Sequence, residues 1–261
     1  MSNFFRKPLF SARAIAVWRR NFLVWKKLAI PSVLGNLGDP MIYMLGLGYG
    51  LGALLPNIDG VAYITFLAAG TICYSTMNSA TFETLYSSFS RMHVQKTWDA
   101  ILNAPVILDD VILGEWAWGA SKSMLSGIAI LIIIWLFDIA QFSWMSLWII
   151  PIIALIGLCF AGMGLVMTAL SSSYDFFMYY FTLLITPMVL VSGVFFPVNQ
   201  LPVFIQNIAM FLPLTHAVEL IRPLVLGGVP DNFGLHIFVL TGYGGVGYYL
   251  ALALSRRRLL K

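Results

Sequence analysis

Charged residues are scarce in this chain. Only 10% of its 261 residues are Asp, Glu, Lys or Arg, whereas 60% are hydrophobic and the mean hydropathy is +0.87. A soluble domain carries about 25% charged residues, so this composition excludes a soluble domain. Continuous apolar runs also exclude a transmembrane β-barrel, whose strands alternate in polarity. We therefore expect an all-α, multi-pass membrane protein.

Cysteines and catalytic signatures are also nearly absent. Cys73 and Cys159 both lie in apolar runs, which indicates small core side chains and not a disulfide or a metal pair. The glycine clusters at 46–52 and 242–247 lack the Lys-Ser/Thr ending of a phosphate loop, and no HExxH or GxSxG motif occurs. We expect no catalytic residue, metal, cofactor or nucleic-acid partner in this chain. Uphill transport would then need another chain or an ion gradient.

Six apolar runs are each long enough to cross a hydrocarbon layer of about 30 Å. They cover residues 28–52, 61–82, 116–137, 144–170, 176–196 and 233–255. Turn-forming residues separate several of them, as in LPNIDG and SSSYD.

The distribution of basic residues predicts the orientation. Lys and Arg are absent from the loops at 55–60 and 138–143, and every one except Arg222 precedes the first span, lies in or beside segment 83–115, or closes the chain. The positive-inside rule then places both termini in the cytoplasm. A seventh span at 203–226 would break this pattern, so we expect the region 197–230 to be re-entrant on the outer side.

The segment 9–27 is predicted to form an amphipathic interface helix, with an aromatic face and a basic face. Its candidate interface residues are Trp18, Arg19, Arg20, Phe22, Trp25 and Lys26. The helix either anchors the first span in the headgroup layer or docks a cytoplasmic partner, and both roles are compatible.

The segment 91–105 is predicted to be a short cytoplasmic helix that Pro105 stops. Its apolar face carries Val94, Trp98, Ile101 and Leu102, and Arg91 falls on the polar face. This face either folds back onto the bundle or inserts into a partner protein. The candidate contact residues are Arg91, Val94, Thr97, Trp98, Ile101, Leu102 and Pro105.

Three charged residues fall within or beside the predicted spans: Asp39, Glu83 and Lys122. Such groups can relay protons. The alternative is a structural polar bracket, in which Asp39 or Glu83 pairs with Lys122.

The outer region is predicted to form a helical hairpin after the fifth span. Candidate gate residues are Gly193, Phe195, Phe196, Pro197 and Pro202. A second short helix carries His216, Glu219 and Arg222 at spacings of three, so that these groups can pair along one side. The hairpin either gates a pathway or only braces the bundle.

These stretches resemble one known family. SGVFFPVNQLP, LPLTHAVELIRPLVLG, LGNLGDPMIYMLGLGYGLG, SATFETLYSSFSRM and TWDAILNAPVILDDVILGE are similar to the ABC-2 type permeases, and in particular to their nodulation protein J branch. The likeness covers nearly the whole chain, as one transmembrane domain over residues 1–261.

The resemblance implies a bacterial inner-membrane exporter subunit with six spans and external re-entrant helices. It implies a homodimer with two copies of a separate ATPase, similar to nodulation protein I, which binds ATP and Mg. The interface helix and a coupling helix at 91–105 would contact that ATPase. Family substrates include polysaccharides, lipid-linked glycans and drugs, and the nodulation branch exports a lipo-chitooligosaccharide.

Two other classes of function compete with this interpretation. A proton-coupled secondary transporter would act without an ATPase and would depend on Asp39. A membrane-embedded lipid or glycan enzyme would need a polar catalytic cluster, and the sequence offers none.

Overall fold

The structure is a computed structural model that describes residues 6–55, 57–58 and 60–259. Pro56 and Asp59 of the first predicted outer loop, and Lys261 of the basic C-terminal stretch, lie outside this description. The regular elements of the described residues are helices except for one two-stranded hairpin, in which Asn57 pairs with Ala62.

The helices and strands follow one another in a simple order. They are α1 (Ala14–Lys26), α2 (Ala29–Gly50), β1 (Asn57–Ile58), β2 (Val61–Ala62), α3 (Tyr63–Phe82), α4 (Thr97–Leu102), α5 (Leu108–Leu136), α6 (Ile149–Leu170), α7 (Asp175–Tyr180), α8 (Thr186–Val191), α9 (Val203–Ala209), α10 (Pro213–Val225) and α11 (Phe233–Leu259). Three π-helical turns interrupt the α-helical pattern, at Glu83–Ser87, Ser90–Val94 and Phe181–Ile185, and short 3-10 turns occur at Leu51–Ala53, Trp144–Trp148 and Val198–Gln200.

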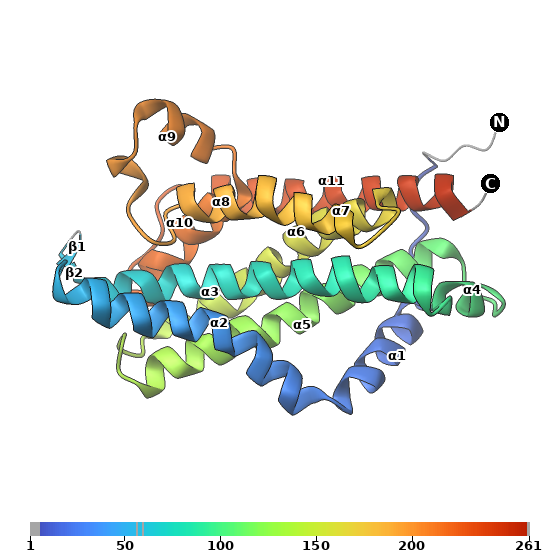
Figure 1. The fold of residues 1–261 in the computed structure, drawn as a ribbon, viewed down its shortest axis with the longest axis horizontal. Coiled ribbons are helices and arrows are strands. Elements are labelled where there is room, and N and C mark those ends of the chain that lie inside the picture. Colours follow the sequence, from blue (N-terminus) through green and yellow to red (C-terminus); the bar gives the residue numbers. More distant parts are fainter. Residues whose placement is uncertain (1–5, 56, 59, 260–261) are drawn as a thin grey trace.

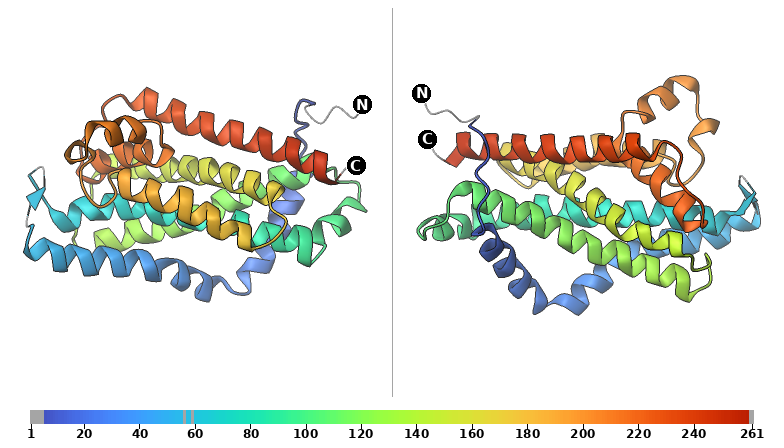
Figure 2. Two further views of the ribbon diagram at one scale, coloured as in Figure 1. Left: turned by 45° about the horizontal axis from the view of Figure 1, so that its top comes forward. Right: turned by 180° about the vertical axis from the view of Figure 1, so that it is seen from behind.

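The long helices run side by side along the long axis of the molecule (Figures 1 and 2). The residues Leu108–Leu136, Trp144–Leu170 and Phe233–Leu259 form helices that are long and apolar enough to cross a membrane. Helices α9 and α10 together pass the same test but meet at 87°, as a broken span or a re-entrant loop would. The chain is a helical membrane protein with several apolar helices.

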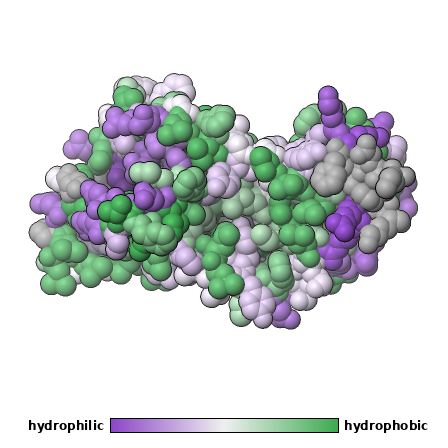
Figure 3. Space-filling model, turned by 90° about the horizontal axis from the view of Figure 1, so that it is seen from above, coloured by the Kyte–Doolittle hydropathy of each residue, from purple (hydrophilic) through white to green (hydrophobic). Residues whose placement is uncertain are grey.

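The two ends of the molecule differ. The hairpin β1–β2 and helix α9 lie at one end, and α4 and the C-terminal end of α11 lie at the other (Figure 1). Seen from above, hydrophilic residues gather toward both ends and the middle is largely apolar (Figure 3). This is the distribution that a bilayer requires, since charged groups are costly in hydrocarbon.

Helices α6 and α11 pack with their backbones in contact. A Cβ added to Gly247 would lie 2.8 Å from the carbonyl carbon of Gly162, and one added to Gly162 would lie 2.9 Å from the carbonyl oxygen of Gly244. Small residues permit such close packing, which lets dispersion forces hold helices together in lipid.

Several predicted boundaries change. The helix predicted at 9–27 covers Ala14–Lys26, and α5 begins at Leu108, eight residues before the predicted third span. The early start of α5 follows from its N-terminal cap, because the backbone N–H of Ile107 donates to Asp110 Oδ2 at 3.2 Å. Helix α2, in contrast, runs through Pro40 as the predicted span 28–52 does.

The outer region changes too. Helix α8 ends at Val191, and Gly193 turns the chain with φ of +80°. Glycine adopts this left-handed conformation without a steric penalty. Phe195 and Phe196, the last two residues of the fifth predicted span (176–196), therefore lie in a turn after α8 and not in a helix. Pro202 precedes α9, and Pro213 begins α10.

Candidate functional site

Three buried charged side chains and one half-buried one form a network near the end of the molecule that carries α4. Glu83, Arg91 and Glu115 are buried, and Lys122 is half-buried. Arg91 Nη2 lies 2.9 Å from Glu83 Oε1 and 2.5 Å from Glu115 Oε2. Lys122 Nζ lies 2.7 Å from the other carboxylate oxygen of Glu83. Two acids and two bases thus balance one another, as burial of charge requires.

Two helical segments bring these groups together. Glu115 and Lys122 are seven residues apart on α5, which is about two α-helical turns and places them on one face. Glu83 and Arg91 lie on the continuation of α3, where Glu83–Ser87 and Ser90–Val94 are π-helical. Because a π-turn inserts extra chain into the helix, the α-helical spacing alone does not predict which face Arg91 occupies.

Neutral donors complete the network. The indole N–H of Trp118 donates to Glu83 Oε1 at 2.8 Å, and the indole N–H of Trp98 donates to Glu115 Oε1 at 3.2 Å. The Ser88 hydroxyl donates to Glu115 Oε2 at 2.8 Å. Glu83 and Glu115 are 3% and 1% exposed, so these hydrogen bonds replace the water that both carboxylates lose.

Helix α4 is held against the bundle by Trp98. This side chain is 1% exposed, whereas Val94 is 64% exposed. Thr97, Ile101 and Leu102 are half-buried, and Pro105 is exposed.

Two expectations for this segment are therefore wrong. Arg91 is buried in an ion-pair network and does not lie on an exposed polar face, and Val94 does not share a buried face with Trp98. The reason is local. The chain is π-helical at Ser90–Val94, and Lys96 then adopts a left-handed conformation with φ of 53°. The exposed residues of α4 are Asp99 and Ala100, and Val94, Lys96 and Asn103 beside the helix are exposed as well.

The aromatic face of α1 packs on α5 around Trp118. The ring centroids of Trp18, Phe22 and Trp25 lie 6.4, 6.3 and 5.9 Å from that of Trp118. The Trp18 indole N–H also donates to Ser121 Oγ at 3.0 Å. Since Trp118 binds Glu83, α1 is linked to the charge network through one side chain.

The basic residues of α1 divide into two groups. Arg19 and Lys26 are exposed, whereas Arg20 is half-buried. Burial lowers the pKa of the Arg20 guanidinium, the charge of Arg91 lowers it further, and Glu115 opposes both effects. Arg20 is therefore close enough to the network to sense its charges.

At the opposite end, the outer turn is fixed by hydrogen bonds to its backbone. Arg222 Nη2 donates to the carbonyl oxygen of Gly193 at 2.5 Å, and the Arg222 guanidinium lies 3.8 Å above the centre of the Phe66 ring. The hydroxyl of Tyr63 donates to the carbonyl oxygen of Phe195 at 3.1 Å. Pro197 is buried and Phe196 is half-buried, so four of the five predicted gate residues lie in one packed turn. The fifth, Pro202, is exposed.

His216 was expected to pair with Glu219 or Arg222 along one side of α10, but its partners lie on other elements. His216 Nδ1 lies 2.8 Å from His236 Nδ1 of α11, and its Nε2 lies 2.9 Å from the carbonyl oxygen of Met210. Glu219 is exposed. The histidine thus joins α10 to α11 and to the end of α9, which spacing along α10 alone could not reveal.

The bracket expected among Asp39, Glu83 and Lys122 is present between Glu83 and Lys122. Asp39 is exposed on α2. Of the two predicted alternatives, the structure thus has the pair of Glu83 with Lys122.

Sequence reasoning missed Glu115 and the pair of Asp109 with Arg256. Glu115 stands seven residues before Lys122 in an apolar stretch, and that spacing was the available signal. Arg256 Nε donates to Asp109 Oδ1 at 3.0 Å, and the backbone N–H of Leu9 donates to Asp109 Oδ2 at 2.9 Å. The N-terminal segment is thus tied to both α5 and α11.

A groove of about 270 Å³ opens between α2, α3, the π-helical turn Phe181–Ile185 and α8. Both polar and apolar side chains line this groove, among them Tyr43, Tyr74, Asn78, Phe181, Thr186 and Phe195. The described residues include no group of three or more side chains that could hold a metal ion.

Comparison with known proteins identifies the family. Residues 13–226 match the ABC-2 type transporter family. The chain is 49% identical to nodulation protein J of Rhizobium meliloti (strain 1021), over 94% of each chain. It is 50% identical to nodulation protein J of Rhizobium leguminosarum bv. viciae, over 95% of each chain. It is 25% identical to the inner membrane transport permease YadH of Escherichia coli (strain K12), over 84% of this chain and 86% of that one. The chain therefore belongs to the ABC-2 type transporter family and is similar to nodulation protein J.

Proposed function

We propose that this chain is the membrane permease of an ATP-driven exporter, and that it moves a lipo-oligosaccharide or a related lipid-linked glycan out across the bacterial inner membrane. A separate ATP-binding subunit, similar to nodulation protein I, supplies the energy and binds ATP and Mg. Membership of the ABC-2 type family and the likeness to nodulation protein J support this proposal.

The observation that carries the proposal is the anchoring of α4. Trp98 of this short helix and Arg91 just before it both bind the carboxylate of Glu115, at 3.2 Å and 2.5 Å. A partner that pushes on the exposed side of α4 would therefore move α3 and α5 with it, because breaking a buried charge network is costly. In this proposal α4 is the coupling helix, and α1 contributes to the same docking surface.

We infer six spans with both termini in the cytoplasm, and the arrangement of the helices supports this orientation. Helix α4, helix α1 and the end of α11 lie toward one end (Figures 1 and 2), and that is the basic end of the chain. Helices α9 and α10 then form the external re-entrant region.

A second copy of the chain is proposed to cover the outward side of α2. This side leaves Ile30, Leu34 and Ile42 exposed by 76%, 64% and 69%. The groove beside α2, with its tyrosines and Asn78, would lie next to that dimer interface and would contact both the acyl and the sugar parts of a substrate.

The secondary-transporter alternative gains no support from the geometry. Asp39 is exposed, and Glu83 is occupied by Arg91 and Lys122 at 2.9 Å and 2.7 Å. A carboxylate with two cations this close stays ionised and is a poor proton carrier.

Co-purification with the ATP-binding subunit tests the proposal. Val94→Asp and Ala100→Asp place a charge on the exposed side of α4, and we expect each to reduce recovery of the subunit about tenfold or more, since one buried unpaired charge costs several kcal/mol. Val229→Asp is the matched control, because Val229 is 70% exposed at the opposite end of the molecule. Undiminished recovery with both α4 variants would contradict the assignment of α4 as the coupling helix.

A further inference from the structure

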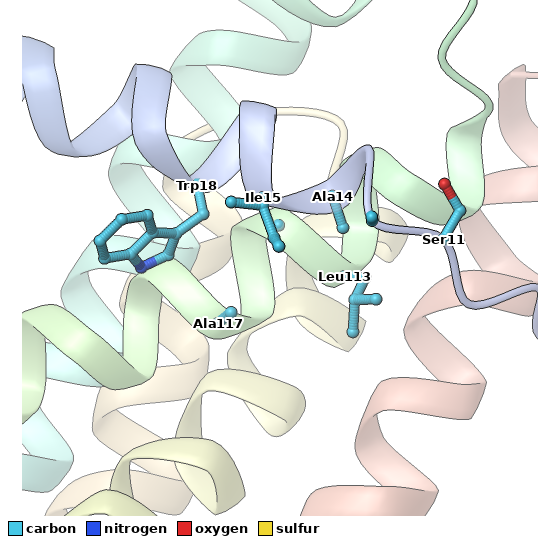
Figure 4. Close-up of a pocket in the computed structure, with 8 residues that line it drawn as sticks. Ser11, Ala14, Ile15, Trp18, Leu113 and Ala117 are labelled. Carbon is cyan, nitrogen blue, oxygen red and sulfur yellow. The ribbon is translucent and has the colours of Figure 1, made fainter.

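An apolar pocket of about 360 Å³ lies between α1 and α5. Figure 4 shows the side chains that line this pocket, with Ser11 at one end of the pocket and Trp18 at the other. The remaining lining residues are Ala12, Ala14, Ile15, Leu113, Gly114 and Ala117. Apart from the Ser11 hydroxyl and the Trp18 indole N–H, which is bound to Ser121, the side chains offer only hydrocarbon.

Small residues leave this pocket open. Helix α1 touches α5 at Gly114, where an added Cβ would lie 2.6 Å from the Cβ of Val17. Beside that contact, Ala12 and Ala117 are too short to fill the space. Ile15 lines the pocket and is still 64% exposed. The pocket thus presents apolar surface whose burial would be favourable.

Basic residues stand next to the lining residues of the pocket along the chain. Residues 6–27 contain seven Lys and Arg and no Asp or Glu. Arg13 stands between Ala12 and Ala14, and Arg19 is one turn beyond Ile15; both are exposed. The ion pairs found among the described residues involve neither arginine.

The nearest acids do not cancel this charge at the surface. Asp109 is paired with Arg256. Asp110 is 0% exposed, and its Oδ2 accepts the backbone N–H of Ile107 at the start of α5. The exposed charges nearest in sequence to the lining residues of α1 are therefore those of Arg13 and Arg19.

We propose that this pocket binds one anionic phospholipid. An acyl chain fills the apolar space between α1 and α5, and the phosphate lies against the guanidinium groups of Arg13 and Arg19. An amphipathic helix in the headgroup layer places both parts of the lipid at the required depth. A zwitterionic lipid has the same chains without net charge, so the arginines select the anionic one.

Native mass spectrometry of the full chain, alone and without an ATP-binding subunit, tests this inference separately from the proposed function. The protein is released from nanodiscs of equal phosphatidylglycerol and phosphatidylcholine, and the bound lipids are counted. We expect roughly tenfold or greater retention of phosphatidylglycerol over phosphatidylcholine, from two basic residues next to the phosphate.

Two pairs of variants locate the site. Ala117→Phe fills the pocket and should remove most of the retained lipid, whereas Ala16→Phe adds the same volume to an exposed position of α1 and should not. Arg13→Gln with Arg19→Gln should abolish the preference for the anionic lipid, whereas Lys26→Gln with Lys27→Gln should preserve it. The arginine pair remains informative even if Ala117→Phe fails to fold, which circular dichroism would show.

Two results would overturn the inference. One is equal retention of the two lipids by the wild-type chain. The other is unchanged retention in a folded Ala117→Phe variant. If that variant instead lost only co-purification with the ATP-binding subunit, the pocket would hold a segment of the partner and not a lipid.

Discussion

The indole N–H of Trp98 donates a hydrogen bond to Oε1 of Glu115 across 3.2 Å, and this contact joins the short helix α4 to the long helix α5. The same carboxylate binds Arg91 from the π-helical end of α3. Three elements thus meet at one buried group. A displacement of α4 would therefore move these partners with it.

The first prediction concerns the balance of charge in this network. Arg91→Met alone leaves Glu115 without its cation, and Glu115→Met alone leaves two cations for the single carboxylate of Glu83. Each should lower the free energy of unfolding by about 3–5 kcal/mol. The double variant keeps the balanced pair of Glu83 with Lys122, so its free energy of unfolding should fall by less than that of either single variant.

Unfolding of the purified protein in detergent measures the free energy of unfolding of all three variants. Glu219→Met is the control, because Glu219 is exposed and its replacement should change stability little. A double variant whose loss equals the sum of the two single losses would show that Arg91 and Glu115 act independently.

The second prediction concerns the contact of α6 with α11. Gly247→Ala forces a Cβ to within 2.8 Å of the Gly162 backbone, which a close-packed interface cannot absorb without separating the helices. We expect a lower thermal midpoint. Gly245→Ala, two residues away, meets no atom within 4 Å and should be neutral or raise stability by about 0.5–1 kcal/mol, since alanine favours a helix. Equal midpoints for the two variants would contradict the packing described for this pair.

The third prediction concerns topology. Asn207 on α9 is exposed, so Asn207→Cys should react with a membrane-impermeant maleimide added outside the cell. Ala100→Cys on α4 should react only when the reagent reaches the cytoplasm. The native cysteines, Cys73 and Cys159, are both 0% exposed and should give little background. Reaction of position 207 from the cytoplasmic side would exclude an external re-entrant region.

The fourth prediction concerns pH. Burial lowers the pKa of the His93 imidazole, and Arg258 and Lys96 lower it further, whereas Asp99 opposes them. Its buried Nε2 has no hydrogen-bond partner among the described residues. The unfolded chain, with an ordinary histidine pKa of about 6.5, therefore binds a proton at a higher pH than the folded chain does. Stability due to neutral His93 is complete above about pH 6.5 and is lost as the pH falls below it.

Thermal unfolding at about pH 5 to 7.5 checks this prediction, since that range brackets the ordinary histidine pKa. His93→Gln should lose less stability on acidification than the wild type. His216 and His236 are common to both proteins, so the difference isolates His93. Identical pH profiles would show that His93 titrates in the same way whether the chain is folded or not.

Much of the fold follows from local patterns. The apolar runs predict the long helices of a membrane protein, and the placement of Lys and Arg predicts which end of the bundle is basic. The pair of Glu83 with Lys122 was one of the predicted alternatives, because charges in an apolar run need a partner.

Residues brought together from far along the chain could not be predicted in this way. Asp109 and Arg256 are 147 positions apart, and no local period relates them. The burial of Arg91 was missed because a period of 3.6 residues assigns it to the wrong face once the helix becomes π-helical at Ser90–Val94. Glu115 was overlooked because its partners lie on two other elements.

Transport by the purified components tests the central claim most directly. The chain is reconstituted into vesicles with its ATP-binding subunit, and movement of a lipo-oligosaccharide is followed with ATP, without ATP, and with a pH gradient alone. The account predicts movement only when the subunit and ATP are both present, and loss of that movement in Ala100→Asp but not in Val229→Asp. Movement driven by a pH gradient in vesicles that lack the subunit would contradict it.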